Sequence, residues 1–216
     1  EIGQSYRVTI PENAIVTQQG EPNDPIWWTF STGDFVTEIS AGSTELAAAI
    51  KTAGSLLTWG KIYESGNSAD GSYTYKMQTI PATFINADVR TVSSGYMHHA
   101  VVKSDNSMWM WGRQYCGEFG NNSTAGSAVP VKVEDDVQIV SAGGQHTAII
   151  KTDGTLWVCG RNDFGQVGDS SVITRTSFVQ IMENVTSVVS GWCVTYAITQ
   201  DGCLWAWGRN DKGQLG

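Results

Sequence analysis

The chain has 216 residues, of which 13 are basic and 21 acidic, so its net charge is −8 at pH 7. DNA, RNA and anionic lipids need a cationic surface, and the acidic balance therefore argues against a nucleic-acid partner. Apolar residues make up 41% of the chain, which excludes a disordered protein, and no apolar run is long enough to span a membrane. We therefore expect a folded domain without membrane insertion.

The composition also indicates a fold class and a location. The chain is rich in serine and threonine, has 24 glycines and 9 tryptophans, and only 16% of its residues are charged. This mixture is typical of an all-β protein with many turns. It favours an extracellular or cell-surface location.

Four segments of the chain repeat one pattern. Each ends in a glycine, Gly60, Gly112, Gly160 or Gly208, and the spacing between these glycines is nearly constant. We therefore divide the chain into an N-terminal extension, residues 1–34, and a repeat region, residues 35–216. The four repeats cover about 35–80, 81–129, 130–176 and 177–216. In the extension, Tyr6–Ile10 and Ile15–Thr17 are candidate capping or closure strands.

Each repeat is predicted to form four short strands. In the third repeat these are Val131–Val133, Val137–Ala142, His146–Lys151 and Thr155–Cys159. Asp153-Gly154 suits a two-residue type I′ hairpin, which would pair Ile150 with Thr155. Both faces of these strands are largely apolar, so both must be covered. Four-stranded units at this period, stacked face to face, indicate a β-propeller.

The same residues carry a resemblance to a known family. The run Val137–Trp157, followed by Gly160–Gly168, resembles the repeat of the regulator of chromosome condensation (RCC-type) family, and Trp207–Gly216 is similar to its closing motif. The resemblance implies a propeller that usually has seven blades, so the four repeats are expected to belong to a larger ring. In character the chain looks closest to bacterial or secreted members, some of which inhibit β-lactamases through loop aromatics.

Strand direction sorts the loops onto two ends of the blades. The end that carries Gly143–Gln145 and the loops after the closing glycines is called the upper face. The opposite end, the lower face, carries the hairpins and an acidic set that we expect to be solvated: Asp88, Asp105, Glu134, Asp135, Asp136, Asp153, Glu183 and Asp201.

Aromatic residues concentrate on the upper face. Thr44, Tyr96, Gly144 and Trp192 share one register, and long loops are expected to hold Tyr63, Tyr73, Tyr75, Tyr115, Phe119 and Phe164. Exposed aromatic side chains often anchor protein interfaces and sugar sites. Tyr96, Trp192, Tyr115, Tyr63, Tyr73 and Tyr75 are therefore the candidate binding residues, whereas Phe119 and Phe164 are expected to pack between blades.

Arginine, histidine and cysteine residues complete the set of candidates. Arg113, Arg161 and Arg209 recur at one register of the repeat, and either form a rim that attracts anions or donate hydrogen bonds between blades. His98 and His146 begin equivalent strands and are expected to be buried and bonded to backbone. The pattern predicts no metal site, since metal-ligand spacings are missing. Four cysteines without a C-x-x-C pair are predicted to be mostly free thiols.

The sequence favours binding over catalysis. It shows no constellation for acid–base or nucleophilic chemistry and no phosphate-binding loop, so we expect no enzyme, catalytic residue or cofactor. The leading hypothesis is a module that binds a protein, or a glycan, through the upper face, with self-association through open blade edges as a further expectation. The alternatives are nucleotide exchange on a Ras-like GTPase, which the resemblance implies, and a propeller-type glycoside hydrolase.

Overall fold

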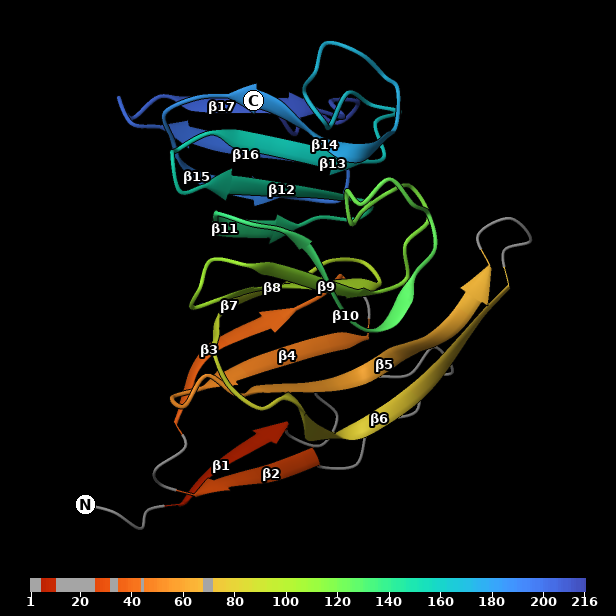
Figure 1. The fold of residues 1–216 in the computed structure, drawn as a ribbon, viewed down its shortest axis with the longest axis vertical. Helices are drawn as coiled ribbons and strands as arrows, with labels where there is room; N and C mark the ends of the chain where they lie inside the picture. Colours follow the sequence, from red (N-terminus) through yellow and green to blue (C-terminus); the bar gives the residue numbers. More distant parts are fainter. Residues whose placement is uncertain (1–4, 11–25, 32–34, 44, 68–71) are drawn as a thin grey trace.

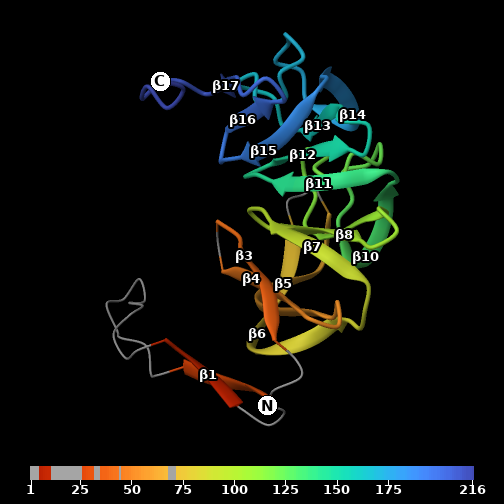
Figure 2. The same cartoon turned by 90° about the vertical axis from the view of Figure 1, so that its left-hand side faces the viewer.

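The computed structural model describes residues 5–10, 26–31, 35–43, 45–67 and 72–216. All regular structure in these residues is β-strand, arranged as a curved stack of antiparallel sheets (Figures 1 and 2). Two strands near the N-terminus, β1 (Ser5–Ile10) and β2 (Ile26–Ser31), pair with each other. The predicted strand Tyr6–Ile10 lies within β1, while Ile15–Thr17 lies outside the described residues. No helix in the described part of the chain is long and apolar enough to cross a membrane.

The repeats form four sheets in chain order. The first contains β3 (Val36–Ala41), β4 (Leu46–Lys51), β5 (Leu56–Asn67) and β6 (Ser72–Ile85). The second contains β7 (Val89–Ser94), β8 (His98–Lys103), β9 (Met108–Gly112) and β10 (Ser127–Glu134). The third contains β11 (Val137–Ala142), β12 (His146–Lys151), β13 (Leu156–Gly160) and β14 (Arg175–Met182). The fourth has three strands, β15 (Val185–Ser190), β16 (Val194–Thr199) and β17 (Leu204–Gly208).

Strand pairing corrects one assignment made from the sequence. Val131–Val133, expected to open the third repeat, lies in β10, where Val131 pairs with Met110 of β9. The outer strand of each complete sheet therefore follows the closing glycine of the same sheet. The sequence repeat and the sheet are offset by one strand.

The hairpins also differ from the prediction. The Gly154 amide bonds the Lys151 carbonyl, and of the three residues between Lys151 and Thr155 only Gly154 has a positive φ, 81°. This is a type I turn followed by a glycine bulge, not a two-residue type I′ turn. The extra residue moves the register by one position, so Ile150 pairs with Leu156 rather than with Thr155.

Each pair of neighbouring sheets encloses its own apolar core. Ala100, Val102, Met108 and Phe119 of the second sheet and its loop pack against Val140 and Ile149 of the third. Ala148, Ile150, Leu156 and Val158 repeat this arrangement against Val188 and Ala197 of the fourth. The expected burial of Phe119 between blades is therefore confirmed, since its side chain is completely buried.

Polar bonds fix how the sheets stack. Ser40 Oγ accepts the Ser94 amide proton at 2.8 Å, and Ser93 Oγ accepts that of Ala142 at 2.9 Å. Ser141 Oγ accepts the amide of Ser190 in the same way at 2.8 Å. The equivalent residue of the fourth sheet is Val189, whose side chain has no hydrogen-bond acceptor.

The buried histidines belong to the same junctions. His98 Nε2 bonds Thr147 Oγ1 of the next sheet at 3.2 Å, and His146 Nε2 bonds Thr195 Oγ1 at 3.0 Å. Burial lowers the pKa of His98 to about 3 and that of His146 to about 4. Both rings are thus neutral at physiological pH. Their burial is as expected, and their ring partners include hydroxyl groups of the following sheet.

Candidate functional site

The upper face carries a backbone ladder that joins all four sheets. The Ser43 amide bonds the Gly95 carbonyl, the Tyr96 amide bonds the Gly143 carbonyl, and the Gly144 amide bonds the Gly191 carbonyl, at 3.3, 3.2 and 3.0 Å. Small residues at the ends of the innermost strands leave a depression of about 240 Å³ beside this ladder. The ladder therefore fixes the position of the aromatic residues that follow these glycines. Thr44, the first member of the predicted register, lies outside the described residues.

Tyr96 and Trp192 meet across the third sheet. Their ring centroids are 4.8 Å apart and the ring planes make an angle of 83°, which is the preferred edge-to-face arrangement. Gly144 lies between their two loops, and a Cβ there would lie 2.5 Å from the Trp192 carbonyl oxygen. Trp192 remains 49% exposed. The pair therefore presents aromatic surface to solvent.

A second aromatic group lies on an extension of the first sheet. Strands β5 and β6 continue beyond the other sheets as a long two-stranded ribbon, on which Tyr63 pairs with Tyr75 (Figure 1). The centroids of Tyr63, Tyr73 and Tyr75 lie 6.1 to 6.5 Å from one another. The expectation that these three tyrosines lie in loops is therefore wrong. Tyr63 is only 6% exposed, so it is the buried member of the group and packs against the other two rings.

The side chain of Arg113 connects the ribbon to the second sheet. The Arg113 guanidinium lies 4.2 Å from the Tyr73 ring centroid and 5.4 Å from that of Tyr115. Burial lowers the pKa of Arg113, but the interactions with Tyr73 and Tyr75 raise it by more. The pKa of Arg113 is therefore above its usual value. Burial, with a smaller contribution from neighbouring tyrosines, raises the pKa of the Tyr63 and Tyr75 hydroxyls. The cluster thus combines a permanent cation with neutral phenols.

Lys61 joins the two aromatic groups. Its Nζ lies 5.0 Å from the Tyr75 ring centroid and 3.6 Å from Glu45 Oε2. Lys61, Glu45, Tyr96 and Met97 line a hollow of about 400 Å³. Together these residues form one surface, the upper-face strip, made of Trp192, Tyr96, Lys61, Tyr75, Tyr73, Arg113 and Tyr115.

Lys61 was not among the predicted site residues, although a signal for it was present. Lys61 follows Gly60, as Arg113 follows Gly112, Arg161 follows Gly160 and Arg209 follows Gly208. A basic residue therefore follows the closing glycine in every repeat. Three of the four basic residues, Lys61, Arg113 and Arg209, lie over an aromatic ring. The ring beside Arg209 is that of Phe164, with its centroid 5.0 Å away.

Arg161 and Arg209 do not donate the predicted hydrogen bonds between blades in the described contacts. Arg161 pairs with Asp163 and donates to Gln145 Oε1, both within its own sheet and loops. Arg209 pairs with Asp211 in the same way and reaches the preceding sheet through Phe164. Phe164 is 41% exposed, so its expected burial between blades is wrong.

A buried carboxylate shapes the loop that carries Tyr115. Glu118 Oε2 accepts the backbone amides of Tyr115 and Cys116, both at 2.7 Å. Burial raises the pKa of Glu118. Gln166 and Gln214 hold the equivalent loops, so Glu118 has a positioning role there.

The histidines, acids and cysteines of the described residues do not form a metal-ligand cluster or a disulfide. No group of three or more histidine, cysteine or acidic side chains there could hold a metal ion. All four cysteines are free, with Cys159 and Cys193 buried and Cys203 exposed. Burial raises the pKa of Cys116 to about 12, so this thiol stays protonated.

Comparison with known proteins agrees with this geometry. Residues 105–150, 137–166 and 185–214 match the Regulator of chromosome condensation (RCC1) repeat, so these segments are RCC1-type repeats. Yeast RCC1 (Prp20), solved in complex with Kap60, superposes with a TM-score of 0.70 at 20% identity, covering 88% of this chain and 47% of that one. Prp20p from Saccharomyces cerevisiae, whose structure is described together with its binding to Gsp1p and histones, has a TM-score of 0.70 at 21% identity, with coverages of 91% and 50%.

Human WBSCR16 is similar to the same degree. Its TM-score is 0.68 at 20% identity, covering 88% of this chain and 52% of that protein. The chain thus spans about half the length of these structures. At such identities the likeness establishes the fold, which is that of RCC1-type β-propeller blades, as predicted.

Proposed function

We propose that this chain is a non-enzymatic propeller module that binds a protein partner through the upper-face strip. The observation that carries the proposal is the edge-to-face pair of Tyr96 and Trp192, two residues from different repeats that the fold brings together on one exposed surface. Five of the six predicted aromatic candidates, with Arg113, contribute directly to the strip. The sixth, Tyr63, supports it.

The chemistry of the strip suits a protein surface. Tyrosine, tryptophan and arginine are the residue types that contribute most to protein–protein binding energy, particularly where surrounding contacts exclude water. Here rigid strands and the glycine ladder hold the aromatic rings in place, so binding would cost little side-chain entropy. The hollow at Lys61 and Tyr96 offers a position for one partner side chain. A glycan is the lesser ligand of the same surface.

A selection experiment tests the proposal. Peptides are selected from a random display library against the wild-type chain and against a Tyr96→Ala/Trp192→Ala variant. Selected peptides should bind the variant at least about tenfold more weakly. Thr79 is exposed on β6 and is not part of the strip, so Thr79→Lys is a control that should bind them normally. Equal binding to wild type and to the double variant would contradict the proposal.

Nucleotide exchange on a Ras-like GTPase is the second candidate. The fold likeness to Prp20p favours it, because that protein is described as binding Gsp1p. The assay is release of labelled GDP from a Ran-like GTPase. Acceleration by the wild-type chain, reduced by the Tyr96→Ala/Trp192→Ala variant, would support exchange through the same surface.

We also propose that the protein is secreted or lies at the cell surface. The serine- and threonine-rich, lysine-poor composition supports a secreted or cell-surface protein.

A glycoside hydrolase would need unpaired acids facing a substrate. On the upper face Asp163, Asp211 and Glu45 each pair with a basic side chain, which favours binding over hydrolysis.

A further inference from the structure

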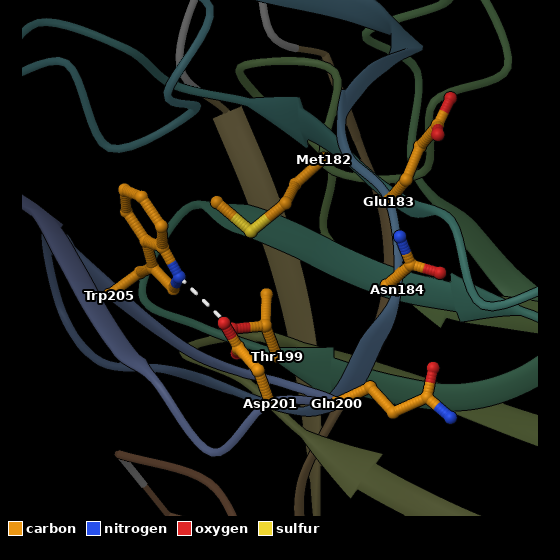
Figure 3. Close-up of a pocket in the computed structure, with 7 residues that line it drawn as sticks. All are labelled: Met182, Glu183, Asn184, Thr199, Gln200, Asp201 and Trp205. Carbon is orange, nitrogen blue, oxygen red and sulfur yellow. Dashed lines mark hydrogen bonds between the residues drawn. The ribbon is translucent and has the colours of Figure 1, made fainter.

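A hollow of about 680 Å³ opens on the lower face, at the junction of the third and fourth sheets. Figure 3 shows its lining, which includes Met182, Glu183, Asn184, Thr199, Asp201 and Trp205. Met182 ends β14 of the third sheet, while Thr199 and Trp205 come from β16 and β17 of the fourth. This site lies at the opposite end of the blades from the upper-face strip.

The equivalent place in two other sheets is filled by the protein itself. In the second sheet Lys103 Nζ lies 4.6 Å from the ring centroid of Trp109. In the third sheet Lys151 Nζ lies 5.1 Å from the centroid of Trp157 and 3.1 Å from Glu134 Oε1. In both cases an ammonium group lies over a tryptophan, and in the third sheet a carboxylate of the preceding outer strand completes the contact.

The fourth sheet keeps the tryptophan and loses the lysine. Trp205 occupies the position in β17 that Trp157 occupies in β13, and Thr199 ends β16 as Lys151 ends β12. Thr199 Oγ1 accepts the Trp205 indole proton at 3.2 Å, so it bonds the ring edge. Trp205 is 49% exposed, since β17 has no outer strand beside it among the described residues, whereas Trp109 and Trp157 pair with residues of β10 and β14 and are half-buried. The position occupied by an ammonium group in the two preceding sheets is therefore open.

The charges around the hollow are negative. Glu183 and Asp201 contribute carboxylates, and no lysine or arginine belongs to its lining among the described residues. Hydrogen bonds from Thr199 and Cys203 lower the pKa of Asp201, which stays ionised. Met182 ends β14 where Glu134 ends β10. The residue after Met182 is Glu183, so a carboxylate still lies near this end of the strand.

We propose that this hollow is a second binding site, which accepts a lysine side chain from a protein partner. The partner's ammonium group lies over the Trp205 ring and near Asp201 and Glu183, as Lys151 lies over Trp157 and beside Glu134. Cation–π attraction and the two carboxylates both favour a primary ammonium ion. One aromatic ring does not make a cage for a methylated lysine, and the two intramolecular occupants are lysines, so unmodified lysine is the ligand.

Nuclear magnetic resonance tests the site directly. The Trp205 indole N–H resonance is assigned as the signal that Trp205→Phe removes. The probes are three capped tripeptides, acetyl-Gly-X-Gly-amide, in which X is lysine, acetyl-lysine or arginine. The lysine peptide should shift the Trp205 resonance in a saturable way, and the acetyl-lysine peptide should leave it unchanged. Equal shifts with acetyl-lysine, or tighter binding of the arginine peptide, would overturn the proposal.

A substitution that copies the neighbouring sheets gives the sharper test. Thr199→Lys should place an internal ammonium group over Trp205 and weaken the lysine peptide at least about tenfold. The fold should accept it, because Lys103 and Lys151 occupy the equivalent position. Thr79→Lys adds the same charge on β6, away from the hollow, and should bind the peptide like the wild type. Unchanged binding by folded Thr199→Lys would overturn the site.

Discussion

Tyr96 and Trp192 pack edge to face at 4.8 Å because Gly144, from the sheet between theirs, leaves room for both loops. The contact links the second sheet to the fourth across the third. It makes the aromatic surface a property of the stacked sheets, since no single repeat contains it.

Gly144→Ala should therefore displace Trp192, which belongs to the upper-face strip. The added Cβ would lie 2.5 Å from the Trp192 carbonyl oxygen and 3.1 Å from its ring, and backbone cannot move aside cheaply. We expect a loss of about 1–3 kcal/mol in the free energy of unfolding, as for overpacked sites. Urea denaturation measures the loss, and a variant as stable as the wild type would contradict the described contact.

Ser93→Ala should weaken the junction between the second and third sheets. It removes the hydroxyl that accepts the Ala142 amide and leaves that buried donor without its partner, at a cost of about 1–3 kcal/mol. Val189→Ser changes the equivalent position of the fourth sheet, which packs against no following sheet among the described residues. The free energy of unfolding of Val189→Ser should match that of the wild type, and equal losses in both variants would argue against this role of Ser93.

Acid should destabilise the protein through His146. Burial lowers its pKa from 6.5 to about 4, so below pH 6.5 the unfolded chain binds a proton that the folded chain does not. The free energy of unfolding should fall as the pH drops from 6.5 toward 4, and the loss should total about 3 kcal/mol once the pH reaches the folded-state pKa of about 4.

Comparison with His146→Gln isolates this histidine. Glu118 acts in the opposite direction, because burial raises its pKa, but it is present in both proteins. Denaturation at several pH values should give a flatter dependence for His146→Gln. The same slope in both proteins would mean that His146 is not buried in its neutral form.

Trp111 and Trp192 should respond very differently to truncation. Trp111 is 2% exposed, stacks on His99 and packs against the tilted ring of Phe84, both with ring centroids 5.0 Å away. Trp111→Ala should cost about 3–5 kcal/mol, as for large buried aromatics. Trp192→Ala should cost much less and should mainly reduce ligand binding. Thermal melts of both variants make the comparison, and unfolding of Trp192→Ala would contradict its assignment to a binding surface.

The open face of the fourth sheet should make the chain self-associate. Leu204 and Ile198 are 69% and 41% exposed, whereas their counterparts Leu156 and Ile150 in the third sheet are 0% and 1% exposed. Light scattering should show a mass that rises with concentration, because exposed apolar sheet surface favours association. Leu204→Glu should suppress the rise. A wild-type chain that stays monomeric at all concentrations would refute this expectation.

The repeated pattern made the sheets and their stacking predictable. Glycines at a fixed spacing and strands that are apolar on both faces left few other folds. The hairpin register escaped prediction because a bulge at Gly154 inserts one residue, which the residue types Asp153-Gly154 do not distinguish from a tighter turn. Repeat boundaries also do not show which sheet an outer strand joins.

The candidate site was predictable in part. The register of Tyr96 and Trp192 followed from the repeats, but their contact depends on sheet stacking. The ribbon was not predictable, because the first repeat departs from the closing motif there and its sequence indicates loops at Tyr63 and Tyr75. Only the pairing of β5 with β6 puts their side chains together and within reach of Arg113.

The three-stranded fourth sheet has a consequence for the order in which the molecule comes apart. Stacked repeats behave as a line of coupled units, each held by its own contacts and by those with its neighbours. Within the described residues, the second and third sheets have a neighbour on both sides, whereas β15–β17 have one neighbouring sheet and no outer strand. Opening should begin at β17 and move inward, so amide hydrogens of β16 and β17 would exchange with solvent long before those of β12.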